Sequence, residues 1–413
     1  GLSQLTVEEG EPLEFESVPF SHPLWILYSS GTTGMPKAIV HGHGGMVLEH
    51  LKVLALHTDL GPSDRFFWFS TTGWMMWNYL VGGLLLGSTI VLYEGSPNSP
   101  DLRRLWQLAC DERVTYFGTS APFLMACRAA GLDLSGLDLN ALRGVGSTGA
   151  PLPAEGFEWV YEHVGAALAL GSASGGTDLC TAFVLGCPWL PVRSGELQCA
   201  ALGASVQAFG ADGTRVVGEL GELVLTQPMP CMPVYFWNDP DGNRLRASYF
   251  EPWPHVWRHG DWLCQYEDGA AVIYGRSDAT LNRGGVRMGT SEFYRVVEEL
   301  AFVADSLVVD TSELGREGQL WLFVVLTPEI VDEGAAFAQL RRVIRSELSP
   351  RHIPDHVLRI AEVPYTLSGK KLEIPVQRIL KGEAPEVAAN LGTLKNPDAL
   401  TALARVAAGV SAG

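Results

Sequence analysis

Strand-like and helix-like segments alternate along the first part of this 413-residue chain, and this alternation constrains the fold more than any other feature. Short apolar runs at 24–28, 65–70 and 114–117 are typical of buried strands, and the patterns at 44–56 and 103–111 are typical of helices. Strands and helices that alternate in this way build a largely parallel sheet covered by helices. We therefore predict an α/β fold for this region.

A different pattern follows near residue 200. Short strand-like segments crowd together at 206–209, 215–217 and 221–226, and Asp212-Gly213 between the first two is a typical hairpin turn. This pattern predicts a β-rich subdomain beside the parallel sheet.

A smaller unit of α+β order is predicted from residue 278 onward. Its expected elements are a helix at 291–300, strands at 304–310 and 320–326, a helix at 335–348 and a strand at 357–360. A chain of this length exceeds one ordinary hydrophobic core. We predict a large domain over 1–277, a small C-terminal domain over 278–381, and a tail over 382–413 that is rich in Ala, Gly, Pro and Asn and holds a short helix at 397–406.

Charge and cysteine content exclude several classes of protein. The chain carries 29 Lys and Arg against 46 Asp and Glu, a net charge of −17, which argues against a general nucleic-acid binder because phosphate backbones attract positive charge. The seven cysteines are scattered and form no CxxC pair, which argues against a zinc site and against a disulfide framework. Free cysteines fit a protein of the reducing cytoplasm. His41 and His43 form an HxH pair without an evident third ligand, and we interpret them as structural.

The longest apolar stretch, at 75–93, is the one candidate for a membrane span. Asn, Gly, Ser and Thr interrupt it, whereas a span needs about 20 predominantly apolar residues. We predict a buried helix to residue 86, a turn at Gly87 and a strand at 89–93, and no membrane span.

A loop of small and hydroxyl residues, SSGTTGMPK, runs from Ser29 to Lys37 directly after the first predicted strand. Such residues let the backbone approach an anion closely, and the lysine adds a positive charge. A Walker A loop would need GxxxxGK followed by Ser or Thr. Here the spacing is GxxGxxK and Ala38 follows Lys37, which argues against a P-loop NTPase; an ordinary surface loop is the other alternative.

The loop is similar to the signature loop of adenylate-forming enzymes, the family of acyl-CoA synthetases, luciferases and adenylation domains of peptide synthetases. This resemblance implies that the loop holds the phosphates of ATP. The nucleotide-binding residues would then be Ser29, Ser30, Gly31, Thr32, Thr33, Gly34 and Lys37.

Two further motifs of the family follow in the family's order. Gly149-Ala150-Pro151 stands where the resemblance implies an adenine-contacting loop. Gly175-Gly176-Thr177-Asp178 resembles the segment whose Thr contacts phosphate and whose acid, usually Glu, helps to hold Mg²⁺. The resemblance thus implies a catalytic role for Thr177 and a metal-binding role for Asp178. Asp is one methylene shorter than Glu but remains a hard oxygen ligand.

The second half of the chain carries the remaining motifs. Asp261, in His-Gly-Asp-Trp, would bind the ribose hydroxyls, and Arg276 would contact the ribose or a phosphate. Asp278 resembles the family's hinge between the large and the small domain. Arg287 matches an arginine that meets the α-phosphate, a role that suits the fixed fork of donors of a guanidinium. Gly285 would lie beside a channel for coenzyme A.

The Ser-Gly-Lys motif that ends at Lys370 resembles the segment with the family's catalytic lysine, although Lys371 beside it leaves a second candidate. In this family the small domain turns about the hinge between the two half-reactions. The resemblance implies that Lys370 serves adenylation and then swings away.

Three stretches, at 23–34, 40–45 and 69–78, resemble the acetoacetate-activating branch of this family. The implied reaction converts ATP, acetoacetate and coenzyme A to acetoacetyl-CoA, AMP and diphosphate through an acyl-adenylate. Acetate-activating relatives carry Trp at the position of Gly175, so Gly175 is expected to widen the acyl pocket, and Gly175→Trp should favour acetate. Trp74, Met75 and Gly176 are the other pocket candidates; ordinary core packing is the alternative for the first two.

The family carries a long region ahead of the phosphate loop, whereas this chain begins a short segment before it. We therefore expect an N-terminally truncated large domain with exposed apolar surface where the remainder packs. The alternatives are another short- or medium-chain acyl-CoA synthetase, or an inactive fragment that binds nucleotide. The pattern carries no prediction of oligomeric state.

Overall fold

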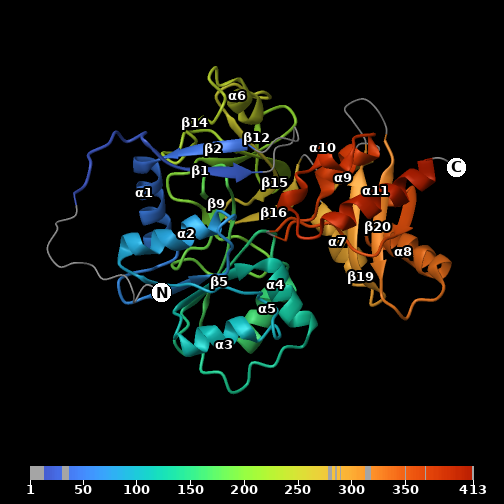
Figure 1. Ribbon diagram of the computed structural model, residues 1–413, viewed down its shortest axis with the longest axis horizontal. Coiled ribbons are helices and arrows are strands. Elements are labelled where there is room, and N and C mark those ends of the chain that lie inside the picture. The colour runs from blue at the N-terminus through green and yellow to red at the C-terminus, as the bar shows by residue number, and fades with distance from the viewer. Residues whose placement is uncertain are drawn as a thin grey trace.

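The centre of the larger part of the molecule is a five-stranded parallel sheet (Figure 1). The structure is a computed structural model that describes residues 14–29, 37–277, 281–283, 286–288, 290–311, 318–348, 350–367 and 369–411. The strand order is β4-β3-β5-β6-β7, and the elements are β3 (Arg65–Trp68), β4 (Thr89–Val91), β5 (Tyr116–Ser120), β6 (Gly144–Thr148) and β7 (Ala169–Ser172). The predicted α/β arrangement is confirmed.

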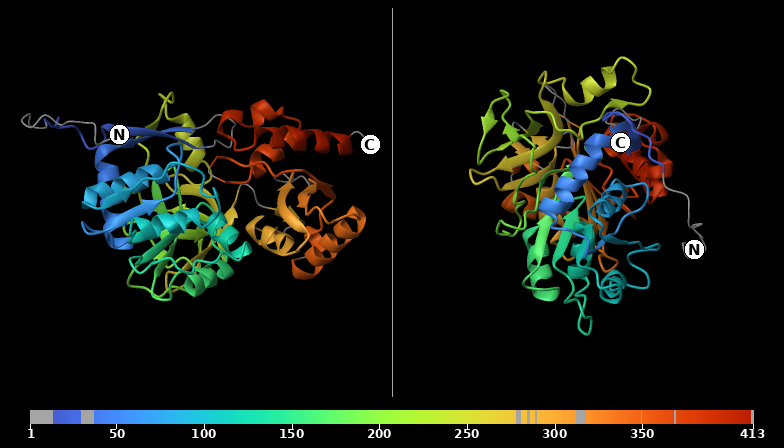
Figure 2. Two further views of the ribbon diagram at one scale, coloured as in Figure 1. Left: turned by 60° about the horizontal axis from the view of Figure 1, so that its bottom comes forward. Right: turned by 90° about the vertical axis from the view of Figure 1, so that its left-hand side faces the viewer.

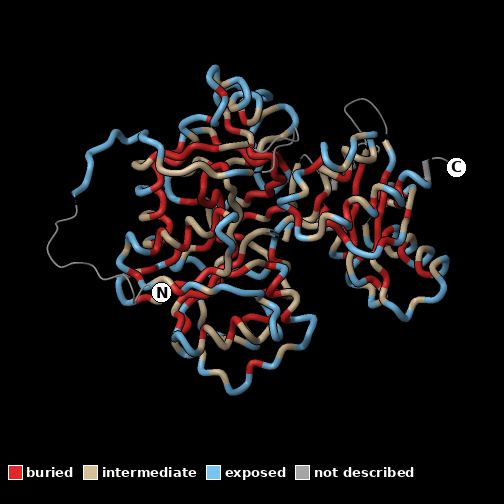
Figure 3. Tube along the Cα trace, in the orientation of Figure 1, coloured by how far each residue is buried: buried red, intermediate tan, exposed pale blue. Residues whose placement is uncertain are grey.

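Three helices cover one face of this sheet: α3 (Arg104–Asp111), α4 (Ala121–Ala129) and α5 (Ala154–His163). Alternate strand residues point to opposite faces. Phe67, Phe117 and Val145 therefore pack against these helices, together with the buried Trp106 and Phe157 of α3 and α5. In Figure 1 the three helices lie next to β5 in the lower part of the view, and Figure 3 shows buried stretches of chain in the same region.

The opposite face of the sheet carries glycine where side chains would be expected. Gly118, Gly144, Gly146 and Gly171, here called the glycine floor, lie on neighbouring strands, because Gly118 pairs with Gly146 and Gly146 with Gly171. A Cβ on Gly118 would come within 2.1 Å of the Trp68 ring, and a Cβ on Gly144 within 2.7 Å of the Tyr116 ring. The glycine floor thus makes room for two aromatic rings that lie over it.

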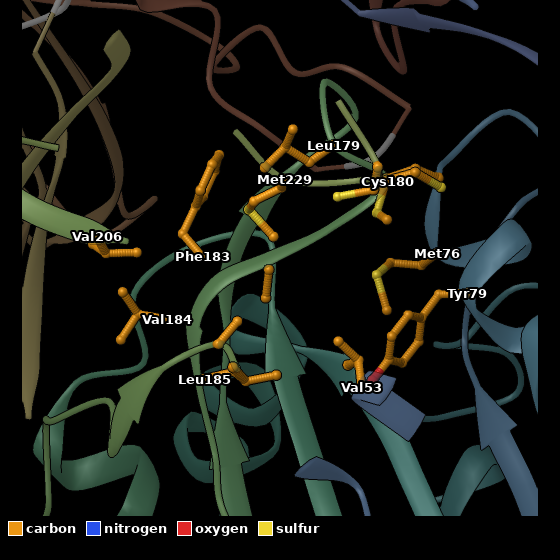
Figure 4. Close-up of a cluster of buried hydrophobic side chains, with 14 of the residues drawn as sticks. Val53, Met76, Tyr79, Leu179, Cys180, Phe183, Val184, Leu185, Val206 and Met229 are labelled. Atoms are coloured by element: carbon orange, nitrogen blue, oxygen red, sulfur yellow. The ribbon is translucent and has the colours of Figure 1, made fainter. Parts of the chain in front are cut away.

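Short helices close the space above the glycine floor. They are α1 (His43–Lys52), the π-helix η2 (Val53–His57), α2 (Met76–Gly82) and the 3-10 helix η3 (Gly83–Leu86). Figure 4 shows Met76 and Tyr79 of α2 beside Val53 of η2 in the buried cluster. Gly87 has a φ of 74° and turns the chain into β4, as predicted.

Three antiparallel sheets lie in the remainder of the larger part. The first has the order β1-β2-β14, the second β10-β9-β8, and the third β12-β11-β13-β15-β16. Their strands are β1 (Pro23–Ser29), β2 (Lys37–Gly42), β8 (Ser174–Gly176), β9 (Thr181–Leu185), β10 (Cys199–Ala200), β11 (Val206–Phe209), β12 (Arg215–Val216), β13 (Leu220–Leu225), β14 (Tyr235–Phe236), β15 (Trp257–Gln265) and β16 (Ala271–Arg276), and the helix α6 (Asn243–Tyr249) lies between β14 and β15. The third sheet contains the β-rich region predicted at 206–226. The strand predicted at 24–28 belongs to the first sheet and not to the parallel sheet, because it pairs in antiparallel fashion with Lys37–Gly42.

The C-terminal part is built on the sheet β19-β20-β21 and lies to the side of the larger part (Figures 1 and 2). One face packs against α7 and α8, and the other against α9 and α11. The elements are β17 (Leu281–Arg283), β18 (Val286–Met288), α7 (Thr290–Glu298), β19 (Val303–Asp310), β20 (Leu320–Leu326), α8 (Glu333–Glu347), the 3-10 helix η4 (Pro350–His352), β21 (His356–Arg359), α9 (Glu373–Leu380), α10 (Pro385–Ala388), the 3-10 helix η5 (Leu391–Thr393) and α11 (Pro397–Ser411).

The segment predicted as a tail packs against this sheet. Helix α11 is longer than the predicted 397–406, and Leu400 and Leu403 are fully buried in a cluster with Trp321 and Phe323. The spacing of Leu400, Leu403 and Ala407 places them on one helix face. The small-residue composition had suggested a loose segment, but this apolar stripe attaches it to the core. The domain boundary at 277/278 stays a prediction, because Asp278 lies outside the described residues.

Exposed apolar side chains gather on the neighbouring elements α1, η2 and η3, which are in contact with one another. They are Val47, Leu48, Leu56, Leu84 and Leu85. Exposed apolar surface was expected from the sequence, and this group is one place where the structure has it; Trp189 and Val331 are examples of exposed apolar side chains elsewhere. No helix in the described part of the chain is both long enough and apolar enough to cross a bilayer.

Candidate active site

One cavity brings together candidate residues from motifs that are far apart in the sequence. It has a volume of about 70 Å³ and lies between the glycine floor, α2, the β8–β9 hairpin and the loop before α9. Seven predicted site residues line it: Trp74, Met75, Gly149, Gly175, Gly176, Thr177 and Lys370. Ligands of parallel α/β sheets bind outside the carboxyl ends of the strands, which is where Gly149 follows β6.

The loop after β6 is shaped by Gly149, whose φ of 89° is a left-handed conformation that favours glycine. Its neighbour Thr148 donates a hydrogen bond of 2.8 Å from Oγ1 to the carbonyl oxygen of Ala173 and so ties this loop to the end of β7. Ala150 and Pro151 are exposed and do not belong to the cavity lining.

Asp178, the predicted metal ligand, is buried and meets the lysine of the phosphate loop. The Lys37 Nζ lies 3.2 Å from the Asp178 Oδ1, and the Tyr249 hydroxyl donates a short hydrogen bond to the same oxygen. The Lys37 ammonium also lies 4.6 Å from the centre of the Tyr249 ring. This contact joins motifs 141 residues apart in sequence, and Tyr249 is a site residue that the sequence motifs do not reveal.

The same groups keep Asp178 ionised. Burial alone raises the pKa of a carboxyl group, but Lys37, His259, Tyr249 and Arg276 together hold the pKa of Asp178 well below its ordinary value. A buried, ionised carboxylate is a suitable ligand for Mg²⁺, which is commonly bound by one or two carboxylates together with nucleotide phosphates. Among the described residues, no three His, Cys, Asp or Glu side chains form a metal site on their own.

His41 has a structural role beside this carboxylate. Its Nε2 donates to the backbone carbonyl of Asp178 at 3.0 Å, and burial lowers the pKa of His41 to about 4, so the ring is neutral near pH 7. His43 contacts the carbonyl oxygen of His22 instead, at 3.0 Å from its Nδ1. The two histidines of the HxH pair therefore bind different partners, as expected of structural residues.

Asp261 and Arg276 pair across the β15–β16 ladder. The Arg276 NH1 lies 3.6 Å from the Asp261 Oδ1, and the His259 Nε2 lies 3.5 Å from Oδ2 of the same carboxylate. Gly260, between His259 and Asp261, has a φ of 91°, and a Cβ there would come within 2.7 Å of the Arg276 guanidinium.

Glu222 of β13 accepts hydrogen bonds from the Gly260 backbone N–H at 3.0 Å and from the Ser277 hydroxyl at 2.9 Å. Glu222 thus supports the segment, and no sequence motif singled it out.

The structure distinguishes the two adjacent lysines. Lys371 is held within the C-terminal part: its Nζ lies 2.5 Å from the Glu298 Oε1, 3.0 Å from the Asp305 Oδ1 and 3.9 Å from the centre of the Tyr294 ring. Lys370 instead lines the cavity. Lys370 is therefore the better candidate for a role in the site.

The pKa of Lys370 is lowered, first because its ammonium is desolvated and then because Arg276 lies near; Asp261 and Asp178 oppose the shift. Much of the residue's surface is nevertheless exposed, so we assign the desolvation to the ammonium end that faces the cavity. The charged groups that act on Lys370 are the candidates for nucleotide and metal binding.

Comparison with known proteins places this site in a family. A family model described as AMP-binding enzyme matches residues 3–236, more than half of the chain. The chain belongs to the AMP-binding enzyme family. Among relatives, an acetoacetyl-coenzyme A synthetase of Rhizobium meliloti is 46% identical over 94% of this chain and 59% of that protein. An acetoacetyl-CoA synthetase of Gallus gallus is 42% identical over 95% of this chain and 59% of that protein.

Two solved structures of similar fold accompany these relatives. Acetoacetyl-CoA synthetase from Streptomyces lividans matches with a TM-score of 0.91 and 48% identity, over 99% of this chain and 62% of that one. An anthranilate CoA ligase in complex with anthranoyl-AMP matches with a TM-score of 0.72 and 23% identity, which supports the fold. The chain spans about three fifths of the length of the curated relatives it matches.

Several residues predicted from the AMP-binding family lie outside the described residues. These are Ser30, Gly31, Thr32, Thr33 and Gly34 of the phosphate loop, Asp278 and Gly285, and the side chain of Arg287 in β18. The two ends of the phosphate loop are described: Ser29 of β1 pairs with Lys37 of β2. The loop therefore connects two adjacent antiparallel strands.

Gly175 lines the cavity, but its missing side chain would not point into free space. A Cβ at Gly175 would come within 2.0 Å of the carbonyl oxygen of Thr181 in β9. Every larger residue at this position must therefore displace the β8–β9 hairpin. The Gly175→Trp exchange expected to favour acetate changes the backbone as well as the pocket, so it does not isolate the size of the pocket.

Proposed function

We propose that this member of the AMP-binding enzyme family is an acid–thiol ligase that forms acetoacetyl-CoA, AMP and diphosphate from acetoacetate, ATP and coenzyme A. The observation that carries this proposal is the similarity of almost the whole chain to proteins named acetoacetyl-CoA synthetases. The cavity supports it, because residues of three family motifs, Gly149, Thr177 and Lys370, line one space.

In the first half-reaction, a carboxylate oxygen of acetoacetate attacks the α-phosphorus of ATP, and diphosphate leaves with the electrons of the broken P–O bond. Such transfers depend mainly on positioning and on charge stabilisation. Lys370 supplies a positive charge at the cavity, and Lys37 and Arg287 act on the phosphates. Asp261 binds the ribose hydroxyls, for which a buried carboxylate offers two acceptor oxygens.

In the second half-reaction, the thiolate of coenzyme A attacks the acyl carbon, and AMP leaves as the thioester forms. Asp178 is the residue that would hold Mg²⁺, and the bound ion would neutralise phosphate charge. Lys37 then has a second role: its ammonium keeps the Asp178 carboxylate ionised at a buried position.

The test is acid-dependent AMP formation from ATP in the presence of coenzyme A and Mg²⁺, with acetoacetate, acetate, propionate, butyrate and 3-hydroxybutyrate compared side by side. We expect the highest kcat/KM with acetoacetate. A preference for another acid would support the ligase reaction and show that acetoacetate is not the substrate. Nucleotide binding without turnover of any acid would support an inactive nucleotide-binding chain instead.

We also propose the cytoplasm as the location of this reaction. All seven cysteines are free thiols in the structure, which suits a reducing compartment. The acidic net charge of −17 supports small-molecule substrates rather than nucleic acid.

A further inference from the structure

Most hydrogen-bonding side chains that line the cavity already have partners. Thr148 and Thr181 donate to the Ala173 carbonyl and to Glu49. His57 uses both ring nitrogens: Nδ1 contacts the Gly186 carbonyl at 2.9 Å, and Nε2 accepts from the Leu202 N–H at 3.0 Å. These groups are satisfied without a substrate and do not need one.

Two further hydroxyls in the cavity satisfy one another. The Thr58 Oγ1 and the Tyr79 hydroxyl lie 2.9 Å apart, and Thr58 also donates to the Val53 carbonyl at 3.3 Å. With its own proton used in that bond, Thr58 accepts from Tyr79. Neither hydroxyl therefore has a free proton for a ligand.

Tyr116 is different. It is 9% exposed and lines the cavity, yet its hydroxyl has no hydrogen-bond partner among the described residues. Burial and the nearby Tyr79 raise the pKa of Tyr116 well above its ordinary value, so the hydroxyl keeps its proton and can donate it. The fully enclosed side-chain atoms that lack a partner do not include this oxygen, so it is open to the cavity, where a ligand can accept its proton.

The position of this hydroxyl follows from the strand register. Tyr116 pairs with Gly144, four residues before the end of β6. Its ring lies over the glycine floor, and its hydroxyl reaches Gly171, where a Cβ would be 3.3 Å from the oxygen. Gly171 pairs with Gly146, two residues before Thr148. The hydroxyl thus lies roughly 7 Å below the carboxyl edge of the sheet, where Gly149 follows.

We infer that the Tyr116 hydroxyl donates a hydrogen bond to the 3-oxo oxygen of the acid and selects 3-oxo acids over saturated acids of the same length. This inference rests on the proposed function and names the group that recognises its substrate. An acid whose carboxylate reacts at the carboxyl edge extends down the sheet face toward Tyr116. A carbonyl oxygen at that depth supplies the acceptor that the hydroxyl lacks, and a methylene does not.

The surroundings strengthen this discrimination. The Tyr116 ring packs against Phe66 and Trp68, with ring centres 5.9 and 6.5 Å away. In such an apolar environment a hydrogen bond is stronger than in water, and an unpaired donor is more costly. A saturated acid leaves the hydroxyl unpaired, whereas a 3-oxo acid pairs it. A site built to bind a polar group rejects the analogue that lacks this group.

The test is Tyr116→Phe, which removes one oxygen and keeps the ring over the glycine floor. We expect kcat/KM for acetoacetate to fall roughly 10–100-fold while kcat/KM for butyrate changes less than about threefold. The acetoacetate-to-butyrate ratio then falls at least about tenfold. The KM for ATP should stay unchanged, and the melting temperature should not fall, because the removed hydroxyl has no partner to lose.

Tyr79→Phe is the matched control, since it removes a hydroxyl from the same cavity that is already bonded to Thr58. It should leave the acetoacetate-to-butyrate ratio unchanged. Trp68→Phe tests the competing donor, because the buried indole Nε1 of Trp68 also lacks a partner. Collapse of the ratio in Trp68→Phe with no change in Tyr116→Phe would overturn the inference.

The wild-type profile separates this inference from the proposed function. A wild-type protein that uses no acid, or that does not prefer acetoacetate, would overturn the proposed function and this inference together. A wild-type protein that prefers acetoacetate, with the same ratio in Tyr116→Phe, would overturn this inference alone.

Discussion

The two adjacent lysines allow a sharp test, because the structure assigns Lys370 to the cavity and Lys371 to the packing of the C-terminal part. We compare Lys371→Met with Lys370→Met, since methionine keeps most of the side-chain length and removes the charge. The first exchange should reduce stability and spare the chemistry of the folded protein. The second should leave stability almost unchanged and abolish the chemistry.

The magnitude for Lys371→Met follows from its contacts. The ammonium donates to the Ser306 carbonyl at 2.5 Å and pairs with Glu298 and Asp305, whose side chains are 35% and 26% exposed. A hydrogen bond to a charged group contributes about 1.5–3 kcal/mol, but partial exposure reduces this. The carboxylates also keep hydroxyl donors, Ser306 for Glu298 and Tyr365 for Asp305. We expect a loss of about 2–3 kcal/mol, with a fall in Tm of roughly 10 °C.

Lys370→Met should change stability by less than about 0.5 kcal/mol, because its ammonium has no ion pair with any of the described residues and desolvation already disfavours its charge. Circular-dichroism melting gives the two Tm values. Acetoacetate-dependent exchange of diphosphate with ATP, measured well below both transitions, gives the activities. We expect exchange to be lost in Lys370→Met and retained in Lys371→Met. Equal Tm values for the two variants, or loss of exchange in Lys371→Met while it is folded, would refute the assignment.

Three further predictions concern the site and its surroundings. Gly175→Ala should lower the free energy of unfolding by about 1–3 kcal/mol in a denaturant titration, because its Cβ meets the Thr181 carbonyl; an unchanged midpoint would contradict this. Asp178→Asn should raise the Mg²⁺ concentration needed for half-maximal activity and leave Lys37 without its ion pair; an unchanged Mg²⁺ dependence would argue against Asp178 as the metal ligand. His41 has a pKa of about 4 in the folded protein against an ordinary 6.5, so the unfolded chain binds its proton first, and stability should fall as the pH drops from about 6.5 to 4. In His41→Gln, which keeps a donor for the Asp178 carbonyl, Tm should fall less steeply over this pH range than in the wild-type protein. The same dependence of Tm on pH in both proteins would show that His41 does not cause the loss of stability.

The local elements could be predicted from sequence because they depend on short-range patterns. The strand expected at 24–28 is β1, the helix expected at 103–111 is α3, and the turn at Gly87 is where it was expected. Each site motif is a short run of residues with a distinct chemical composition, so it can be picked out in the sequence. The structure brings Thr177 and Lys370 to one cavity, and their roles there stay predictions.

The remaining features depend on contacts between distant segments, which a single sequence does not display. Tyr249 reaches Asp178 across 71 residues, and Lys371 binds Glu298 across 73. The role of Tyr116 depends on glycines in two neighbouring strands, so its strand pattern alone suggested only a core residue. The helix expected at 397–406 was placed in a tail for a related reason, because the packing of Leu400 and Leu403 depends on Trp321 and Phe323, which lie far earlier in the sequence.

The glycine floor has a consequence for attempts to broaden the range of acids. The floor of the cavity consists of rings supported by bare backbone, so its depth is determined by the absence of β-carbons rather than by the size of lining side chains. Substitutions at Gly118, Gly144 or Gly146 can only push Trp68 or Tyr116 upward and make the cavity shallower. A library that aims at longer acids should therefore leave the glycines constant and vary Trp68 and Tyr116, because smaller side chains at these two positions are what can deepen the cavity.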